Sequence, residues 1–464
     1  MVGHEATATS SLAEVIHQEL GQNVFLCNQC LRCSSGCPLS EHFDLLPSQV
    51  MRRLQLGDDA VLESKAIWLC ASCQTCTTRC PQGLDVAGIM DALRIEARRR
   101  GLPPAVPQVA AFQRLFLGEV RALGRLYEVG LMAGLNLATK QPLKDVPMGL
   151  EMLRRRKLRL LPSVARRPRR VSEVTQDGRT VGYFPGCSLH ASASEYDRTT
   201  RAVAAAVGLT LVEPPGWTCC GSTPAHATDP VLAATLPMQT LTTVEAMGLD
   251  TLLTPCSACF SRMRAAIRAV EGDDGFARVV AQRIGRAFHG RVAVRHLLDV
   301  LVNRVGLKAI RDAVRRPLSG LKIACYYGCL VTRPPELTGV EHAENPTAIE
   351  ELVRALGAQP IDWSYKIDCC GASLSLTQTE LALKMSRRII EDAHERGADL
   401  MVTVCPLCHV NLDARQMQME LPYRMPILYL TQLMVLAFGG DERSAVLDRN
   451  LVDPRSALRA YGIS

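Results

Sequence analysis

Two segments, TLLTPCSAC at residues 251–259 and LMVTVCPLC at residues 400–408, decide how this chain folds. Each joins a short apolar run, typical of a buried strand, to a Cys-x-x-Cys pair. Each also closes a larger pattern of five cysteines, which reads Gly-Cys, then Cys-Cys-Gly, then Cys-x-x-Cys. The first set of five is Cys187, Cys219, Cys220, Cys256 and Cys259, and the second is Cys329, Cys369, Cys370, Cys405 and Cys408. The matched flanking residues of the two sets indicate one structural unit that occurs twice.

Five thiols in each set exceed the four ligands of a tetrahedral zinc ion or of a cubane iron–sulfur cluster. Neighbouring side chains in an extended segment point to opposite sides, so the pair Cys219-Cys220 is suited to straddle an extended object rather than to share one iron. Gly221 and Gly371, which follow the two pairs, permit a positive φ and a close backbone. We interpret each set as the ligands of a noncubane iron–sulfur cluster, and we expect the two clusters to face each other across a cleft. The ten cysteines are therefore the candidate catalytic residues.

The N-terminal region carries a second repeated motif. Cys27-x-x-Cys30-x-x-Cys33-x-x-x-Cys37-Pro recurs as Cys70-x-x-Cys73-x-x-Cys76-x-x-x-Cys80-Pro. This spacing is typical of two-cluster ferredoxins, in which the fourth cysteine of each motif binds the neighbouring cluster. It predicts one cubane [4Fe–4S] cluster on Cys27, Cys30, Cys33 and Cys80 and a second on Cys70, Cys73, Cys76 and Cys37. Two zinc sites or a set of disulfides are the alternatives, and the three-residue rhythm with Cys-Pro favours clusters.

The composition is that of a folded soluble protein, with 47% hydrophobic and 21% charged residues among 464. Its 19 cysteines require an explanation, and a chain of this size is not of the small secreted class that disulfides hold together. Residues 1–18 show no signal peptide, and no apolar run reaches the roughly 18 residues of a spanning helix. We therefore expect a cytoplasmic protein, membrane-associated only through a partner, with no transmembrane segment of its own.

A basic run accounts for the net charge of +7. Residues 154–170 contain nine lysines and arginines and no acidic residue. Because no aromatic residues that would stack on bases are interleaved, we do not expect nucleic-acid binding. We interpret the run as a solvated linker able to dock on an acidic partner surface.

The expected elements give a mixed architecture, α+β overall with α/β repeats. Residues 1–105 are predicted to form an all-α, two-cluster ferredoxin-like domain, and residues 106–179 a helical and basic linker with a helix over 148–161. Strand and helix signals then alternate through two repeated Cys-Cys-Gly modules, at 180–318 and 319–464. In both modules the cysteines follow the carboxyl ends of strands, where α/β folds place their sites.

Together, two ferredoxin motifs and two Cys-Cys-Gly modules resemble the C-type and B-type subunits of heterodisulfide reductase fused in one chain, as in the D-type form of that enzyme. LCASCQTCTTRCP at residues 69–81 is similar to the C-type motif, and Tyr183-Phe-Pro-Gly-Cys187 and Tyr327-Gly-Cys329 match the openings of the B-type modules. The resemblance implies two noncubane [4Fe–4S] clusters on the ten cysteines and a disulfide substrate that is split between them. It also implies a partner that delivers electrons, either a flavin-containing heterodisulfide reductase protein of the A type or a membrane cytochrome.

Other functions stay open at this point. The same two-part pattern occurs in electron-transfer subunits that serve flavin dehydrogenases of the glycolate, glycerol-3-phosphate or succinate type, and a zinc-stabilised interaction scaffold is a third hypothesis. The sequence names neither the disulfide nor the direction of electron flow. His226, soon after the first Cys-Cys-Gly, is the first candidate for a proton donor, followed by His190, His409, Tyr183 and Tyr326. Cys325 lies outside the repeated pattern and is expected to be a buried apolar residue.

Overall fold

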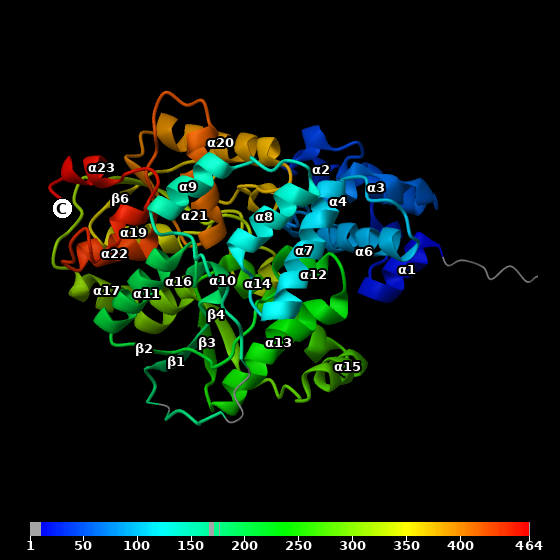
Figure 1. Cartoon of the computed structure of the whole chain (residues 1–464), viewed down its shortest axis with the longest axis horizontal. Coiled ribbons are helices and arrows are strands. Elements are labelled where there is room, and N and C mark those ends of the chain that lie inside the picture. Colours follow the sequence, from blue (N-terminus) through cyan, green and yellow to red (C-terminus); the bar gives the residue numbers. More distant parts are fainter. Residues whose placement is uncertain (1–10, 167–170, 176, 464) are drawn as a thin grey trace, which may run out of the picture. The chain divides into compact units, whose positions relative to one another are not determined.

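The computed structural model describes residues 11–166, 171–175 and 177–463. The chain divides into two compact units, Met1–Ala110 and Ala111–Ser464 (Figure 1). Among the described residues, none of the helices combines the length and the apolar content that crossing a lipid bilayer requires.

Short helices build the described part of the smaller unit. They are α1 Leu12–Leu20, α2 Arg32–Ser35, α3 Pro47–Gln55, α4 Lys65–Leu69, α5 Thr75–Thr78 and α6 Val86–Arg99, with 3-10 turns at Val24–Leu26, Ser40–His42 and Asp59–Glu63. α1 begins at a capping box, because the Ser11 hydroxyl accepts from the Glu14 N–H while the Glu14 carboxylate accepts from the Ser11 N–H. Asp85 caps α6 by accepting the N–H of Gly88 at 2.9 Å.

The larger unit contains two four-stranded parallel sheets that repeat one topology. The first runs in the order β2-β1-β3-β4 and the second in the order β6-β5-β7-β8. The strands are β1 Thr180–Tyr183, β2 Thr210–Val212, β3 Thr251–Thr254, β4 Ala293–His296, β5 Lys322–Tyr326, β6 Gln359–Pro360, β7 Leu400–Thr403 and β8 Ile427–Tyr429. Gly182 of β1 pairs with Leu252 of β3, and Ile323 of β5 pairs with Leu400 of β7. The mixed α/β architecture predicted from the sequence is confirmed.

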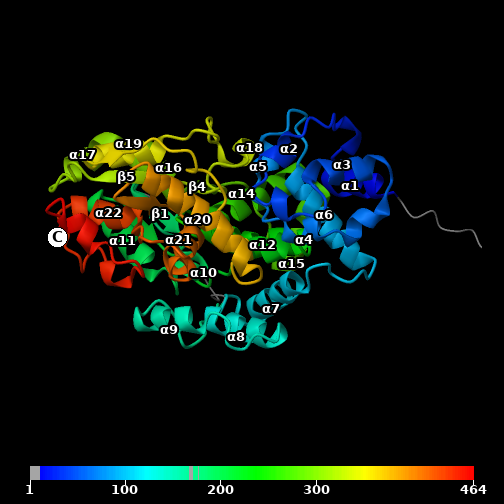
Figure 2. The ribbon, with the colours of Figure 1, turned by 90° about the horizontal axis from the view of Figure 1, so that it is seen from above.

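Helices pack around the two sheets (Figures 1 and 2). They are α7 Pro107–Leu123, α8 Glu128–Ala138, α9 Val146–Arg154, α10 Gly186–Leu189, α11 Ser194–Ala206, α12 Ser222–His226, α13 Pro230–Ala246, α14 Ser257–Gly272, α15 Asp274–Ile284, α16 Leu297–Asp299, α17 Leu307–Ala313, α18 Pro335–Thr338, α19 Ala348–Ala355, α20 Thr379–Glu395, α21 Pro406–Asp413, α22 Leu430–Ala437 and α23 Arg455–Arg459. One apolar core runs through both modules, and it includes Val181 and Leu252 from the first sheet and Val402 and Leu428 from the second.

The basic run differs from the expectation. The helix predicted over 148–161 ends at Arg154, because the chain leaves helical geometry at Arg156, whose φ is 56°. The next residue, Lys157, is fully buried, so the run is not simply a solvated linker. Its members at 167–170 lie outside the described residues.

The sheets also contain two strands that were not predicted, β4 and β8. β8 is followed directly by α22, which begins at Leu430. Each of these strands is an edge strand that pairs with the strand before the Cys-x-x-Cys, as Leu252 with Val294 and Val402 with Leu428.

Candidate functional site

The two Cys-x-x-Cys pairs lie just beyond the carboxyl ends of central strands. Cys256 follows β3 and Cys405 follows β7, and each is the residue at which the next helix, α14 or α21, begins. Cys187 and Cys329 follow β1 and β5 in the same way. Because neighbouring parallel strands end at the same edge of a sheet, each module gathers its cysteines at that edge.

The first set of five forms one connected group of thiols. The sulfurs of Cys220 and Cys259 are 3.3 Å apart. Cys219 lies close enough to Cys187 and Cys220 for both thiols to raise its pKa, and Cys259 likewise acts on the pKa of Cys256. Each sulfur of the set therefore has another sulfur of the set as its neighbour.

The second set is arranged around Tyr326. The sulfurs of Cys370 and Cys408 are 3.5 Å apart, and the nearby Cys405 thiol raises the pKa of Cys408. Burial raises the pKa of the Tyr326 hydroxyl well above its ordinary value, and four nearby thiols raise it further. These four are Cys408, Cys370, Cys369 and Cys329.

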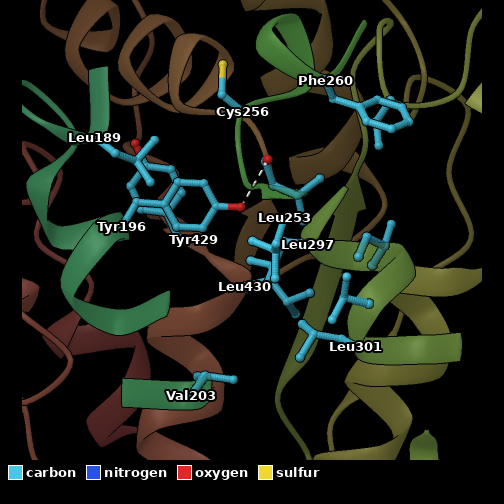
Figure 3. Packing of buried hydrophobic residues seen from close by; sticks show 14 of the residues in the cluster. Leu189, Tyr196, Val203, Leu253, Cys256, Phe260, Leu297, Leu301, Tyr429 and Leu430 are labelled. Carbon is cyan, nitrogen blue, oxygen red and sulfur yellow. Dashed lines mark hydrogen bonds between the residues drawn. The ribbon is translucent and has the colours of Figure 1, made fainter. Parts of the chain in front are cut away.

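The two sets meet at Cys256 and Cys405, whose thiols lie close enough to shift each other's pKa across the two modules. Tyr196 of α11 covers this place. Its hydroxyl is 3.3 Å from the carbonyl oxygen of Pro255 and 3.1 Å from that of Val404, the residues directly before the two cysteines. Figure 3 shows its ring beside Cys256. The thiols of both modules thus form a single continuous series.

Neighbouring thiols shift the pKa values within each set in opposite directions. Hydrogen bonds with two adjacent thiols lower the pKa of Cys220 and of Cys405 well below the ordinary value of 9.0. Hydrogen bonds and burial raise the pKa of Cys219 and of Cys408 well above it. A positive charge among the thiols, as metal binding supplies, favours ionisation of those whose pKa is raised.

A glycine makes room for one cysteine in each module. A Cβ on Gly186 would lie 3.1 Å from Sγ of Cys259, and a Cβ on Gly328 would lie 3.0 Å from Sγ of Cys408. Both glycines also have positive φ, 68° and 70°. The Gly-Cys element of the pattern is thereby explained, because any side chain at the glycine would displace the last thiol of the same set.

The residues at the site fit iron–sulfur clusters. Every candidate ligand is a thiol, and these thiols are grouped and largely buried. Thr254 and Thr403, at matched positions before the two Cys-x-x-Cys pairs, have buried hydroxyls with no hydrogen-bond partner in the described structure. Leaving such a group unsatisfied costs about 1–3 kcal/mol. Within the described ranges, no three His, Cys, Asp or Glu side chains surround a point at the distances of a single metal ion.

In the smaller unit, the two ferredoxin motifs share an unusual backbone. The residues on both sides of Cys30 and of Cys73 have positive φ, between 50° and 64°, although none of them is glycine. They are Gln29, Leu31, Ser72 and Gln74. Such a backbone turns successive N–H groups toward one side, which favours a bound anionic group.

The fourth cysteine of the first motif, Cys37, lies beside the second motif. Burial raises the pKa of Cys76 well above its ordinary value, and the nearby Cys70, Cys73 and Cys37 raise it further. For Cys33 the neighbouring thiols are instead Cys27 and Cys30. The thiols of the smaller unit therefore fall into two groups, one for each motif, and Cys37 lies next to the thiols of the second motif.

The candidate proton donors are spread over the larger unit. The hydroxyl of Tyr183 donates to the Asp197 carboxylate at 2.8 Å, and that of Tyr326 donates to the carbonyl of Asp368 at 2.7 Å. His226 is the last residue of the short helix α12, which begins directly after Gly221.

The other two histidines are buried to different degrees. His190 has its Nδ1 2.7 Å from Nη1 of Arg159, and partial burial lowers its pKa. His409 is fully buried with Nε2 3.0 Å from the carbonyl oxygen of Ile427, and burial lowers its pKa well below 6.5. His409 is therefore a neutral core residue.

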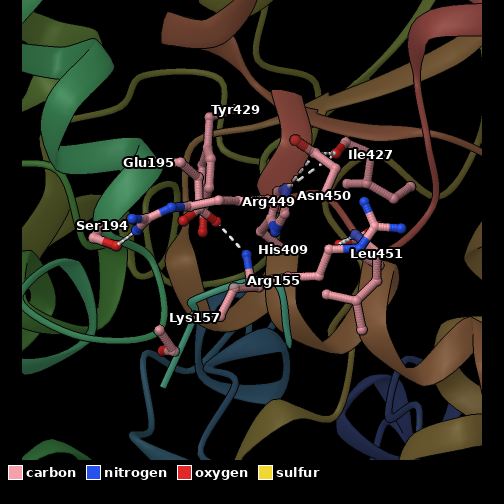
Figure 4. A network of polar contacts seen from close by, with 12 residues as sticks. Arg155, Lys157, Ser194, Glu195, His409, Ile427, Tyr429, Arg449, Asn450 and Leu451 are labelled. Atoms are coloured by element: carbon pink, nitrogen blue, oxygen red, sulfur yellow. Dashed lines mark hydrogen bonds and ion pairs between the residues drawn. The ribbon is translucent and has the colours of Figure 1, made fainter. Parts of the chain in front are cut away.

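A group of buried charges was not found from the sequence. Lys157 forms an ion pair with Glu195 of α11, and both side chains are fully buried (Figure 4). Glu128 accepts a hydrogen bond from Ser192 at 2.7 Å, and burial raises its pKa to about 7. Burial raises the pKa of Asp413 to about 6. The sequence around Lys157 shows only a lysine within an all-basic run. Its partner Glu195 lies 38 residues away, so nothing local indicates the buried ion pair.

Comparisons with known proteins match both parts of the chain. A family model described as a cysteine-rich domain matches residues 181–264 and again 323–413, and a 4Fe-4S dicluster domain matches residues 26–85. The 8-methylmenaquinol:fumarate reductase membrane anchor subunit of Wolinella succinogenes is 34% identical over 59% of this chain and 98% of its own length. The B subunit of the ferredoxin/F420H2-dependent CoB-CoM heterodisulfide reductase of Methanosarcina acetivorans is 26% identical over 61% of this chain and 98% of its own.

Two further matches concern the N-terminal part and the fold. An iron-sulfur C-type subunit of the CoB–CoM heterodisulfide reductase of Methanocaldococcus jannaschii is 31% identical over 28% of this chain and 68% of its own. The crystal structure of a hypothetical protein from Helicobacter pylori aligns with a TM-score of 0.50 at 10% identity. The alignment covers 70% of this chain and 60% of the Helicobacter chain. At this identity the match supports a similarity of fold only.

The fold and the grouped cysteines define an iron–sulfur electron-transfer protein that carries [4Fe–4S] clusters. The chain belongs to the heterodisulfide reductase family of iron–sulfur subunits, and it joins a C-type part and a B-type part in one polypeptide.

Proposed function

We propose that the chain is the catalytic iron–sulfur subunit of a heterodisulfide reductase-like complex, which reduces a disulfide to two thiols or runs the reverse reaction. The observation that carries the proposal is the contact between Cys256 and Cys405, because it joins two complete sets of five cysteines at one place. A protein that only relayed electrons would not need both sets intact. Reduction of a disulfide consumes two electrons and two protons and yields two thiols, so two adjacent one-electron centres suit it.

The ligand sets are proposed as the motifs group them. Cys27, Cys30, Cys33 and Cys80 would hold one cubane, and Cys70, Cys73, Cys76 and Cys37 the other. Cys187, Cys219, Cys220, Cys256 and Cys259 would hold one noncubane [4Fe–4S] cluster, and Cys329, Cys369, Cys370, Cys405 and Cys408 the second. When bound, the clusters supply electrons one at a time from the smaller unit to the disulfide.

The residues of the chain supply the remaining requirements. Burial of the cysteines keeps water away from the sulfur chemistry, and Gly186 and Gly328 set the position of the last thiol in each set. His226 is our candidate for a proton donor, because an imidazole titrates near neutral pH and this one lies five residues after Gly221. Electrons would reach the chain from a flavin-containing heterodisulfide reductase protein of the A type or from a membrane cytochrome, and the complex would be cytoplasmic or held at a membrane by that partner.

The test begins with anaerobic purification and reconstitution of the full chain. We expect about 16 iron atoms and as many sulfides per chain, if all four clusters hold four irons. After reduction with a low-potential donor, a panel of low-molecular-weight disulfides is added and released thiols are counted. Cys405→Ser should abolish thiol release, whereas Cys325→Ser, a buried cysteine that belongs to neither set, should retain it. Iron for two cubanes only, or no thiol from any disulfide, would remove the proposal.

A second function is favoured by one relative. The Wolinella protein is named as a subunit of a fumarate reductase, so this chain is alternatively an electron-transfer subunit for a flavin dehydrogenase of the succinate, glycolate or glycerol-3-phosphate type. In that case a flavoprotein with such an activity should co-purify with the chain. Reduced chain should then pass electrons to the flavin without releasing thiols.

A further inference from the structure

The segment from the end of α8 to residue 164 exposes an unusual number of large apolar side chains. Eight of the 16 exposed large hydrophobic residues in the described structure lie in this stretch of 28 positions. They are Leu137, Leu143, Val146, Leu150, Leu153, Leu160, Leu161 and Val164. Leu143 and Leu161 are each 80% exposed. We call these eight residues and the basic side chains among them the apolar–basic surface. Figure 2 shows α8 and α9, in cyan, along one edge of the larger unit.

Helix α9 is apolar on two opposite sides. Met148 and Met152 are buried and pack against Ala414 of the second module. Val146, Leu150 and Leu153 have the spacing i, i+4 and i+7, so they share another face, and that face is exposed. The inner side anchors the helix to the fold, and the outer side has no use within it.

The charges on this surface have one sign. Lys140, Arg154, Arg156, Arg159 and Arg166 are exposed. The two acidic residues between positions 129 and 166 are both engaged. Asp145 is buried in a bidentate pair with Arg415, at 2.5 and 2.9 Å, and Glu151 accepts from Arg155 at 2.9 Å. No exposed carboxylate among these described residues opposes the positive charge.

We infer that the apolar–basic surface docks the chain directly on an anionic lipid membrane. Protruding leucines interleaved with arginines are the composition of segments that lie in the headgroup region with their apolar side chains inserted. The basic side chains meet the anionic headgroups within a Debye length of the surface. An acidic protein face or a nucleic acid would satisfy the arginines but would leave leucines that are up to 80% exposed without an apolar partner. The inference is independent of which redox reaction the cysteines serve.

The test is co-sedimentation of the purified full chain with vesicles of phosphatidylcholine alone and of phosphatidylcholine with phosphatidylglycerol. We expect binding to the anionic vesicles that weakens as salt is raised. Leu143→Ser/Leu150→Ser should lower the partition coefficient by tenfold or more, because two exposed leucines no longer insert. Arg154→Gln/Arg156→Gln should remove most of the preference for anionic lipid. Leu56→Ser, at a leucine that is 67% exposed elsewhere, should bind as the wild type does.

Two further measurements, thermal unfolding and co-purification, distinguish loss of lipid binding from misfolding of a variant and from loss of a protein partner. All substituted residues are exposed, so thermal unfolding should match the wild type in every variant. The idea is overturned if the wild type remains in the supernatant with both vesicle types, or if the leucine double variant binds as well as Leu56→Ser. It is also overturned if vesicle binding is absent while the leucine variant loses a co-purifying protein, because the surface is then a protein interface.

Discussion

Gly328 and Cys408 approach so closely that a Cβ on the glycine would lie 3.0 Å from the cysteine sulfur, and Gly186 and Cys259 repeat this contact in the first module at 3.1 Å. The two contacts link the first and last members of each five-cysteine pattern, although 80 and 73 residues separate them in the chain. The glycine and the last cysteine of each pattern are therefore linked by a contact in the folded structure, which explains why the pattern contains both.

We expect Gly328→Ala to lower the iron content of the reconstituted chain, because the second set of cysteines should no longer bind its cluster. The added methyl meets the Cys408 sulfur, and alanine at a φ of 70° is strained by about 1–2 kcal/mol. Gly397→Ala is the matched control, because its φ is 78° but a Cβ there would meet nothing within 4 Å. Both variants should lose similar stability in thermal unfolding, and only Gly328→Ala should lose iron. Equal iron content in the two variants would show that Cys408 is not held in place by this contact.

Tyr196 joins the modules through both its ring and its hydroxyl. The ring stacks on Tyr429 at 4.1 Å between centroids and 6° between planes. Tyr196→Phe keeps the stack and removes the hydroxyl contacts to Pro255 and Val404, so we expect a loss of about 0.5–1.5 kcal/mol. Tyr196→Ala removes both and should cost about 3–5 kcal/mol. Chemical denaturation measures both, with Tyr461→Phe at the surface as the control; equal losses in the two Tyr196 variants would contradict the role of the stack.

Because Lys157 and Glu195 form a buried ion pair, we expect the effect of substituting one of them on the free energy of unfolding to depend strongly on whether the other is present. Lys157→Met leaves the Glu195 charge buried without its partner and should destabilise by about 3–5 kcal/mol. Adding Glu195→Gln should restore a large part of this loss in a double-mutant cycle. Lys308→Met, which breaks an exposed pair with Asp312, should change stability by no more than about 0.5 kcal/mol. Additive effects of the two buried substitutions would mean that the pair does not form.

Glu128 predicts how stability depends on pH. Its pKa rises from 4.5 to about 7 because burial outweighs the hydrogen bond from Ser192 and the attraction of Lys157, with Glu195 adding repulsion. A raised carboxyl pKa means that the folded state binds the proton more tightly than the unfolded state does. This contribution to stability is complete below about pH 4.5 and is lost as the pH rises through about 7.

Glu128→Gln should remove that loss. We expect the variant to gain about 1–3 kcal/mol over the wild type between pH 5 and pH 8, measured by urea denaturation at a series of pH values. Glu14→Gln, in the first turn of α1, is the control for the same chemical change at another site. A wild-type and variant difference that stays constant across this range would place the Glu128 pKa near its ordinary value.

The grouping of Cys37 with the second ferredoxin motif predicts which cluster it serves. Cys37→Ser should weaken the cluster of Cys70, Cys73 and Cys76 and spare that of Cys27, Cys30 and Cys33. Cys80→Ser should do the opposite. Iron analysis with electron paramagnetic resonance of the reduced chain tests this, since the two variants should each lose a different signal. Loss of the same signal in both would reject the exchange of fourth cysteines.

The sequence predicted the features that depend on the spacing of cysteines along the chain. It did not predict the features that depend on contacts between residues far apart in the sequence. The Cys-x-x-Cys pairs follow strands because apolar runs such as 251–254 precede them, and these strands are present as β3 and β7. β4 was missed because four residues of mixed polarity are too short to give a clear periodic signal, and β8 because its three apolar residues continue without a break into the apolar helix α22. Pairing to a buried neighbouring strand is what makes both segments strands. The burial of Lys157 was equally hidden in the sequence, because Lys157 stands in a run of arginines and its partner Glu195 belongs to another element.

The close approach of Cys256 and Cys405 has a consequence for how this chain can change over time. Each of the two repeated modules contributes one half of the joined series of thiols, so a chain that kept a single module would lack the thiol that its own Cys-x-x-Cys pair meets in the other module. Such a shortened chain would need a second copy of itself to bring the two halves of the series together again.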